Sequence, residues 1–174
     1  MIMFMLDFTV GKYKELCLAL LDSGYTPLTV YSYLRTGKQN NNKKLIVLRH
    51  DIDRKPMNAL KMAELEHELG IQSTYYFRFP YTFKPEIIRK IRGLGHEVGY
   101  HYEVLSKAKG DYEKAIELFE QELEEFRKIV DVETICMHGS PLSRYDNRDL
   151  WTRYDFKEFG IVGEAYLSIK GVRA

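Results

Sequence analysis

The apolar run Leu45–Leu48, bounded by Lys44 and Arg49, is the feature that most restricts how this chain can fold. It is too short for a buried helix, and its leucine, isoleucine and valine side chains suit a strand that is buried on both faces. Such a strand needs helices on both sides, which is the situation in parallel α/β sheets. The run therefore predicts an α/β protein.

Helix and strand patterns alternate along the rest of the chain. They predict helices at 12–21 and 28–34, then a strand at 45–50, a helix at 57–69, a strand at 73–79, a helix at 85–92, a strand at 97–101, a helix at 111–130, a strand at 134–138, a helix at 147–154 and a strand at 161–167. Repeated βα units favour a parallel sheet, either doubly wound or closed into a barrel. A full βα barrel takes about 250 residues, so 174 residues are expected to form an open sheet or a barrel incomplete at its C-terminus.

The chain is expected to form a single domain over residues 1–174, with an N-terminal helical extension at 1–43 and a core at 44–174. The polar, asparagine-rich segment 37–44 is expected to be a mobile surface loop. Cys17 and Cys136 are far apart in the sequence and are expected to be buried thiols.

The charge balance argues against nucleic acid as a partner. The 26 lysines and arginines nearly cancel the 25 aspartates and glutamates, so no net field draws the protein to a polyanion. The apolar N-terminus lacks the charged start and cleavage site of a signal peptide, and no stretch approaches the ~20 apolar residues of a membrane span. We therefore expect a cytoplasmic protein without a membrane span.

Asp51 and Asp53 follow the first predicted core strand. Because side chains alternate along a strand, the two carboxylates should point to the same side, away from His50 and Ile52. Two carboxylates so close together repel each other unless a cation or a shared proton lies between them. A metal ion is the simplest solution. The alternative is structural, with one aspartate capping the next helix and the other paired with a neighbouring arginine.

Two more polar clusters follow predicted strands. His101 and Glu103 come after the strand at 97–101, and His138 comes after the strand at 134–138. The carboxyl ends of parallel strands meet at one edge, so these side chains should converge with Asp51 and Asp53. Imidazole and carboxylate are a common ligand set for zinc and related ions. Each histidine taken alone could equally be structural, and His138 could instead carry a proton.

The motifs that carry these residues resemble the polysaccharide deacetylases, the family with the NodB-homology domain. Leu45–Asp53, LIVLRHDID, resembles the family's first motif, a buried strand that ends in two aspartates. Gly95–His101, GHEVGYH, is similar to the second motif, and Met137–Pro141, MHGSP, falls where the family has an arginine- and proline-containing loop. The combination is most similar to a divergent branch associated with surface-polysaccharide biosynthesis.

This resemblance implies a distorted seven-stranded (β/α) barrel, incomplete here, with Asp51 as catalytic base. Asp53 and His101 would be metal ligands, and His138 would be the catalytic acid. Leu105 stands where the family has its next metal-binding histidine. A replacement third ligand is therefore expected among His138, Glu103 and His50. The implied cofactor is a divalent metal, zinc above all, with nickel or cobalt as alternatives.

The implied reaction is metal-dependent removal of an N-acetyl group from a sugar or polysaccharide. Tyr75, Tyr76, Tyr81, Tyr100 and Tyr102 offer flat surfaces for sugar rings, although aromatic strand residues are more often core. One alternative is a metal-dependent hydrolase of another small amide. The other is a carbohydrate-binding relative with an impaired site. An incomplete barrel could also cover its open edge by forming a homo-oligomer.

Overall fold

The computed structural model describes residues 9–36, 43–139 and 142–169. Its centre is a parallel sheet of five strands, which are adjacent in the order in which they occur in the chain. They are β3 (Arg49–Ile52), β4 (Thr74–Phe77), β5 (Glu97–Tyr102), β6 (Thr134–Met137) and β7 (Gly163–Glu164). Because the order never reverses, every crossover proceeds in the same direction, as in a βα barrel and unlike a doubly wound sheet.

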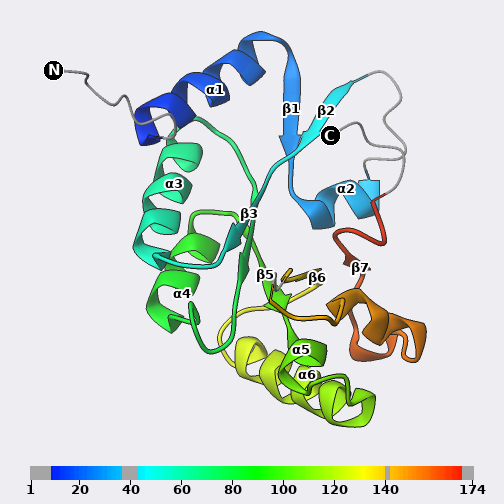
Figure 1. Ribbon diagram of the computed structural model, residues 1–174. Helices are drawn as coiled ribbons and strands as arrows, with labels where there is room; N and C mark the ends of the chain where they lie inside the picture. The colour runs from blue at the N-terminus through cyan, green and yellow to red at the C-terminus, as the bar shows by residue number, and fades with distance from the viewer. Residues whose placement is uncertain (1–8, 37–42, 140–141, 170–174) are drawn as a thin grey trace, which may run out of the picture.

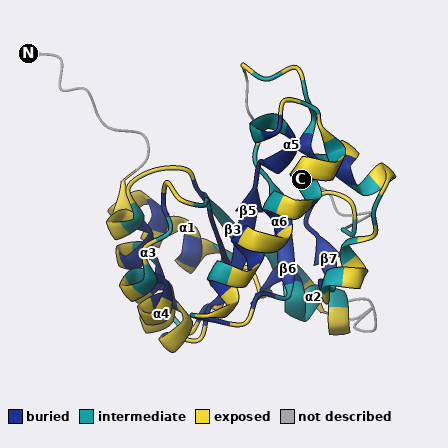
Figure 2. Cartoon of the chain, turned by 90° about the horizontal axis from the view of Figure 1, so that it is seen from below, coloured by how far each residue is buried: buried dark blue, intermediate teal, exposed yellow. Residues whose placement is uncertain are grey.

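Helices connect the strands and pack around them (Figure 1). They are α3 (Pro56–Glu68), α4 (Pro85–Gly93), α5 (Val104–Lys107) and α6 (Tyr112–Arg127), followed by the 3-10 helices η2 (Asn147–Thr152) and η3 (Phe156–Phe159). Asp111 caps α6 by accepting a hydrogen bond from the backbone N–H of Lys114. Figure 2 shows β5, β6 and β7 mostly buried and the outer faces of the helices exposed, whereas most of β3 is only partly buried.

The predicted α/β class with parallel strands is confirmed. The described strands form an arc, and no closed barrel is seen in residues 9–36, 43–139 and 142–169. Of the predicted strand at 161–167 only the two residues of β7 are extended, and 165–168 form a turn. The predicted loop at 37–44 lies mostly outside the described residues, which resume at 43.

The predicted strand at 45–50 is in fact two strands joined at Leu48. β2 (Lys44–Val47) pairs with β1 (Tyr25–Leu28), whereas β3 pairs with β4. The N–H of Leu48 donates to the carbonyl of Leu28 over 3.1 Å, and the carbonyl of Leu48 accepts from the N–H of Thr74 over 3.0 Å. A single residue, Leu48, therefore links the two-stranded ladder to the five-stranded one.

The segment after β1 lies against the inner face of the arc, in both figures close to β7. In α2 (Val30–Thr36), the N–H of Val30 donates to Thr74 Oγ1 over 2.8 Å and the N–H of Tyr31 donates to Glu97 Oε2 over 2.9 Å. The Val30 side chain is buried in a cluster with Tyr76, Cys136 and Ala165. The N-terminal part of the chain thus supplies core to the arc. The predicted helix at 28–34 begins two residues later than expected, because Leu28 ends β1.

α1 (Val10–Asp22) covers the opposite side of the molecule, where Tyr13 and Cys17 pack against Leu65 and Ile71. Cys17 and Cys136 are both buried and free, as predicted. No helix in the described part of the chain is long and apolar enough to cross a membrane.

Candidate metal centre

The three predicted polar clusters meet at the carboxyl edge of the five-stranded sheet. Asp51 lies in β3 and Asp53 just after it, His101 lies in β5, and His138 follows β6. β3 ends at Ile52, and the N–H of Asp53 donates to the carbonyl of Asp51 over 3.2 Å, so the chain turns between the two carboxylates. Both carboxylates still come close to His101, but in two different groups of side chains.

Asp53, His101 and His138 form the first group. The Nε2 atoms of His138 and His101 lie 3.2 Å and 3.5 Å from the same oxygen, Oδ1 of Asp53. The ligand atoms of all three residues lie within 4.8 Å of one another. The histidines are nearly buried, whereas the Asp53 side chain is 51% exposed, so the group opens to solvent on one side. Three protein ligands with one open position are typical of catalytic zinc sites.

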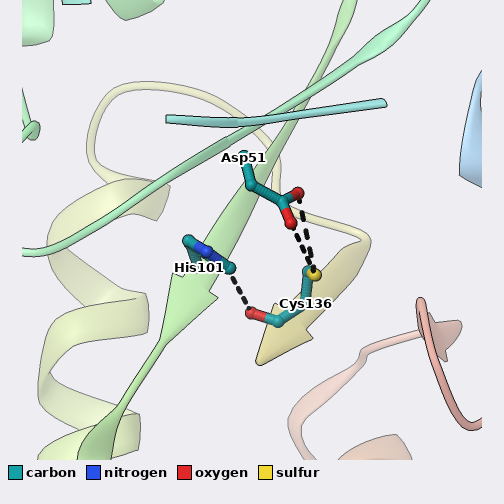
Figure 3. Close-up of side chains that lie close together, drawn as sticks. All are labelled: Asp51, His101 and Cys136. Atoms are coloured by element: carbon teal, nitrogen blue, oxygen red, sulfur yellow. Dashed lines mark hydrogen bonds between the residues drawn. The ribbon is translucent and has the colours of Figure 1, made fainter. Parts of the chain in front are cut away.

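The hydrogen bonding of His101 leaves one ring nitrogen available to a metal. Its Nδ1 lies 2.9 Å from the carbonyl oxygen of Cys136, the contact drawn in Figure 3. A carbonyl can only accept, so Nδ1 carries the proton and the neutral ring has its lone pair on Nε2, which faces Asp53. Metal-binding histidines are commonly oriented by such a bond to a backbone carbonyl.

Glu103 lies on the other side of the His138 ring. Its Oε2 is 3.2 Å from His138 Nδ1, although this contact lacks the alignment of a hydrogen bond. Arg78 Nη2 donates to both oxygens of Glu103 over 2.8 Å and 2.9 Å. Burial opposes the charge on Glu103, but the interactions with His138 and Arg78 outweigh it and lower the pKa of this carboxyl. Glu103 therefore lies where an outer-shell carboxylate would orient His138.

Asp51, His101 and Cys136 form the second group (Figure 3). The oxygens of Asp51 lie 3.8 Å and 3.9 Å from the Cys136 sulfur, and Arg49 Nη2 lies 3.4 Å from Asp51 Oδ2. Burial, and then the charge of Asp51, raise the pKa of the Cys136 thiol far above its ordinary value. Because a protonated thiol is a poor ligand, this group suits a metal less well than the first group does.

The remaining histidines lie away from this edge or are engaged elsewhere. His50 points to the other face of β3, where its Nε2 lies 2.7 Å from the buried Glu66, so it is not placed to be the third ligand. His96 is buried, with its Nε2 2.9 Å from the carbonyl of Ala63, and His67 is on the surface next to the carbonyl of Leu94.

A cavity of about 380 Å³ opens beside His138. Its lining comes from the end of β6 and from the loop leading into η2: Met137, His138, Gly139, Ser143, Arg144, Tyr145, Asp146 and Asn147. Asn147 fixes this wall, because its Nδ2 donates to the carbonyl of His138 over 2.9 Å and its Oδ1 accepts from the N–H of Ser106 over 3.0 Å. The volume lies in the range that small-molecule sites occupy.

Some residues at this edge were not singled out by the sequence. Arg78, directly after β4, contacts Glu103 and was not expected there. Arg49 contacts Asp51, which is the pairing with a neighbouring arginine that the structural alternative predicted for one aspartate. The position of Arg78 at the carboxyl end of a predicted strand was the available signal, since this edge collects ligand-contacting residues from every strand.

No protein-family model matches this chain, and no curated protein matches it. The geometry of the site and the sequence motifs are therefore what indicates a function.

Replacing Glu103 by glutamine is expected to weaken zinc binding by about 10- to 100-fold, the usual effect of losing an outer-shell carboxylate. A neutral amide attracts the Nδ1 side of the His138 ring less strongly than a carboxylate does. The ring is then held less firmly in the orientation that points its Nε2 at the metal position. Zinc affinity can be measured by titration against a chromophoric chelator. Glu120→Gln, an exposed change on α6, serves as the control. Equal affinities for Glu103→Gln and the wild type would remove Glu103 from the site.

Proposed function

We propose that this protein is a metal-dependent hydrolase that removes an N-acetyl group from a sugar. The observation that carries the proposal is the group Asp53, His101 and His138, in which two imidazole nitrogens face one carboxylate oxygen and the His101 lone pair points into the group. The resemblance of LIVLRHDID and GHEVGYH to the polysaccharide deacetylase motifs supports it. We further propose that the parallel arc is an incomplete version of the barrel of that family.

The residues present fit a divalent ion such as zinc. Asp53, His101 and His138 would hold it. His138 would then be the third ligand in place of the family's second histidine, whose position in this sequence is occupied by Leu105. When bound, the ion polarises the acetamide carbonyl and lowers the pKa of an attacking water. Nickel or cobalt would suit the same donors.

Asp51 is the carboxylate of the site that is not assigned to the metal, and it is therefore available to transfer a proton from water to the leaving amine. It is not needed as a ligand, its side chain is 27% exposed, and Arg49 Nη2 lies 3.4 Å from it. We propose that Asp51 takes a proton from water as the oxygen adds to the acetyl carbon. The same carboxylic acid then gives this proton to the amine nitrogen as the carbon–nitrogen bond breaks, which leaves acetate and an amino sugar. His138 is thereby assigned to metal binding rather than to acid catalysis, because its Nε2 faces Asp53.

The test is acetate release by the zinc-loaded protein from N-acetylglucosamine and its β-1,4-linked oligomers, with Asp51→Asn as the informative variant. We expect the variant to keep its ion and to lose about 10²- to 10⁴-fold in rate, the usual contribution of a general acid–base group. Metal content and acetate release are measured on the same samples.

Asp131→Asn is the matched control, since Asp131 is exposed and lies before β6, at the amino end of that strand. Full activity in Asp51→Asn would contradict the assigned base. A wild type that binds zinc but releases no acetate from any of these sugars would overturn the proposed substrate and favour another amide.

A further inference from the structure

The second group of potential metal ligands, Asp51, His101 and Cys136, differs from the first by its sulfur donor. Its ligand atoms also lie within 4.8 Å of one another. His101 and Cys136 are paired residues of the neighbouring strands β5 and β6, so their side chains point to the same face of the sheet. Asp51 reaches them from β3, as Figure 3 shows. Three strands therefore supply one donor each.

The thiol proton of Cys136 lies where an ion would bind. Arg49 Nη1 donates to the sulfur over 3.2 Å, and the thiol itself donates towards the Asp51 carboxylate, whose oxygens are 3.8 Å and 3.9 Å away. An ion that replaces this proton gains the sulfur and an Asp51 oxygen as ligands, and the proton passes to solvent. At zinc bond lengths, a sulfur and an oxygen ligand in tetrahedral geometry are about 3.6 Å apart. The observed separation therefore suits an ion with slightly longer bonds than zinc.

The surroundings of the sulfur also favour a soft ion. Cys136 is fully buried and packs in a cluster with Val30, Tyr76 and Ala165. The Asp51 side chain is 27% exposed, so it connects the buried sulfur to solvent. Sulfur ligands select soft metal ions, and a largely apolar surrounding limits the access of competing water. The second group is thus the weaker one for zinc but the better one for a thiophilic ion.

The two groups compete for one side chain, because both need His101. A neutral imidazole has a lone pair on one of its two nitrogens, so it binds one metal ion at a time. An ion held by the second group would therefore deprive Asp53 and His138 of their third ligand. It would also occupy the carboxylate of Asp51.

We propose that Asp51, His101 and Cys136 form a second metal site, which takes a soft, thiophilic divalent ion such as Cd²⁺ and excludes the ion of the first group while it is filled. The protein would then hold zinc in the first group or a soft ion in the second group, but not both. Acetate release would stop when the second site fills, because Asp51 becomes a ligand and is no longer available as the base. This last consequence rests on the proposed function, whereas the metal exchange does not.

The test adds Cd²⁺ to the zinc-loaded protein and follows the ultraviolet absorption of the cadmium–thiolate bond, together with the zinc and cadmium content after gel filtration. We expect the absorption to appear as about one Cd²⁺ per chain binds and an equal amount of zinc is released. Cys136→Ser should show no such absorption and should keep its zinc. Asp51→Asn keeps the sulfur, and it should bind Cd²⁺ at least about tenfold more weakly, the lower limit found even for outer-shell residues.

Cys17→Ser is the matched control, since Cys17 is also a buried free cysteine but lies in α1, and this variant should keep the absorption. His138→Ala removes a ligand of the first group alone and should keep it too. The inference would be overturned by absorption that survives in Cys136→Ser, is lost in His138→Ala or never appears in the wild type, and equally by zinc and cadmium bound to the same chain. Metal exchange as expected in a protein that releases no acetate would keep the second site and remove the hydrolase.

Discussion

Replacing Asp53 by alanine is expected to remove the divalent ion from the protein and to abolish acetate release with it. One oxygen of Asp53 faces both His101 Nε2 and His138 Nε2, so the variant leaves two neutral imidazoles without the negative charge between them. The loss of affinity should exceed the 10- to 100-fold effect typical of outer-shell residues. Metal content after dialysis, measured by mass spectrometry, should fall from about one ion per chain to near zero.

The exposed position of Asp53 and a neighbouring control variant make this test decisive. Asp53 is half exposed, so its removal should leave the fold intact, and far-ultraviolet circular dichroism should match that of the wild type. Asp51→Asn, two residues away, should keep the ion. If Asp53→Ala instead retains a full equivalent of zinc, the metal belongs to the group Asp51, His101 and Cys136, and Cys136→Ser should then release it.

Replacing Glu66 by alanine is expected to destabilise the fold by about 3–5 kcal/mol, the range found when a buried charged partner is removed. Glu66 is fully buried in α3 and its carboxylate accepts from the hydroxyls of Ser73, over 2.5 Å, and of Tyr75, over 2.7 Å. His50 lies 2.7 Å away on its other side, and the hydroxyl of Tyr13 also donates to it. Alanine would remove the acceptor that the buried hydroxyls of Ser73 and Tyr75 share. Urea unfolding measures the effect.

The same carboxylate should give the protein a distinct acid transition. Burial would raise the pKa of Glu66, but the interactions with His50, Ser73 and Tyr13 outweigh it and lower the pKa from 4.5 to about 2. A lowered folded pKa means that stability is fully present above pH 4.5 and is lost as the pH falls towards 2. The shift corresponds to about 3 kcal/mol. Glu66→Gln should lack this portion of the pH dependence.

Glu64→Ala is the control for both measurements, because Glu64 is exposed on the same helix. It should change stability by less than about 0.5 kcal/mol. A Glu66→Ala variant as stable as Glu64→Ala would show that this buried cluster contributes little to the fold.

The convergence of Asp53, His101 and His138 could be predicted from the sequence because it depends on a general property of parallel sheets. Each residue lies at the carboxyl end of a strand, and those ends share one edge. The choice among third ligands could have been narrowed further. The alternation that turns Asp51 towards the site turns His50 away from it, so the exclusion of His50 followed from the same argument.

Other features depend on contacts between distant parts of the chain. β1 was missed because Pro27 is unfavourable in a strand, and the segment becomes extended only through its pairing with β2. The break at Leu48 follows from that pairing and could not be seen without it. The burial of Glu66 was not predicted, although its spacing from Ala59 and Ala63 places it on the core face of the helix.

The position of α2 against the inner face of the arc has a consequence for biosynthesis. The N–H groups of Val30 and Tyr31 bond to Thr74 and Glu97, which lie 44 and 66 residues further along the chain. At about 5–20 residues per second, the ribosome needs several seconds to make these partners after α2 has been synthesised. During that interval the nascent segment exposes Val30, a residue that is fully buried in the finished protein. Because Val30 also packs against Cys136 and Ala165, this segment cannot be fully buried until β6 and β7 have been made, and we expect the nascent chain to stay open to chaperones there until then.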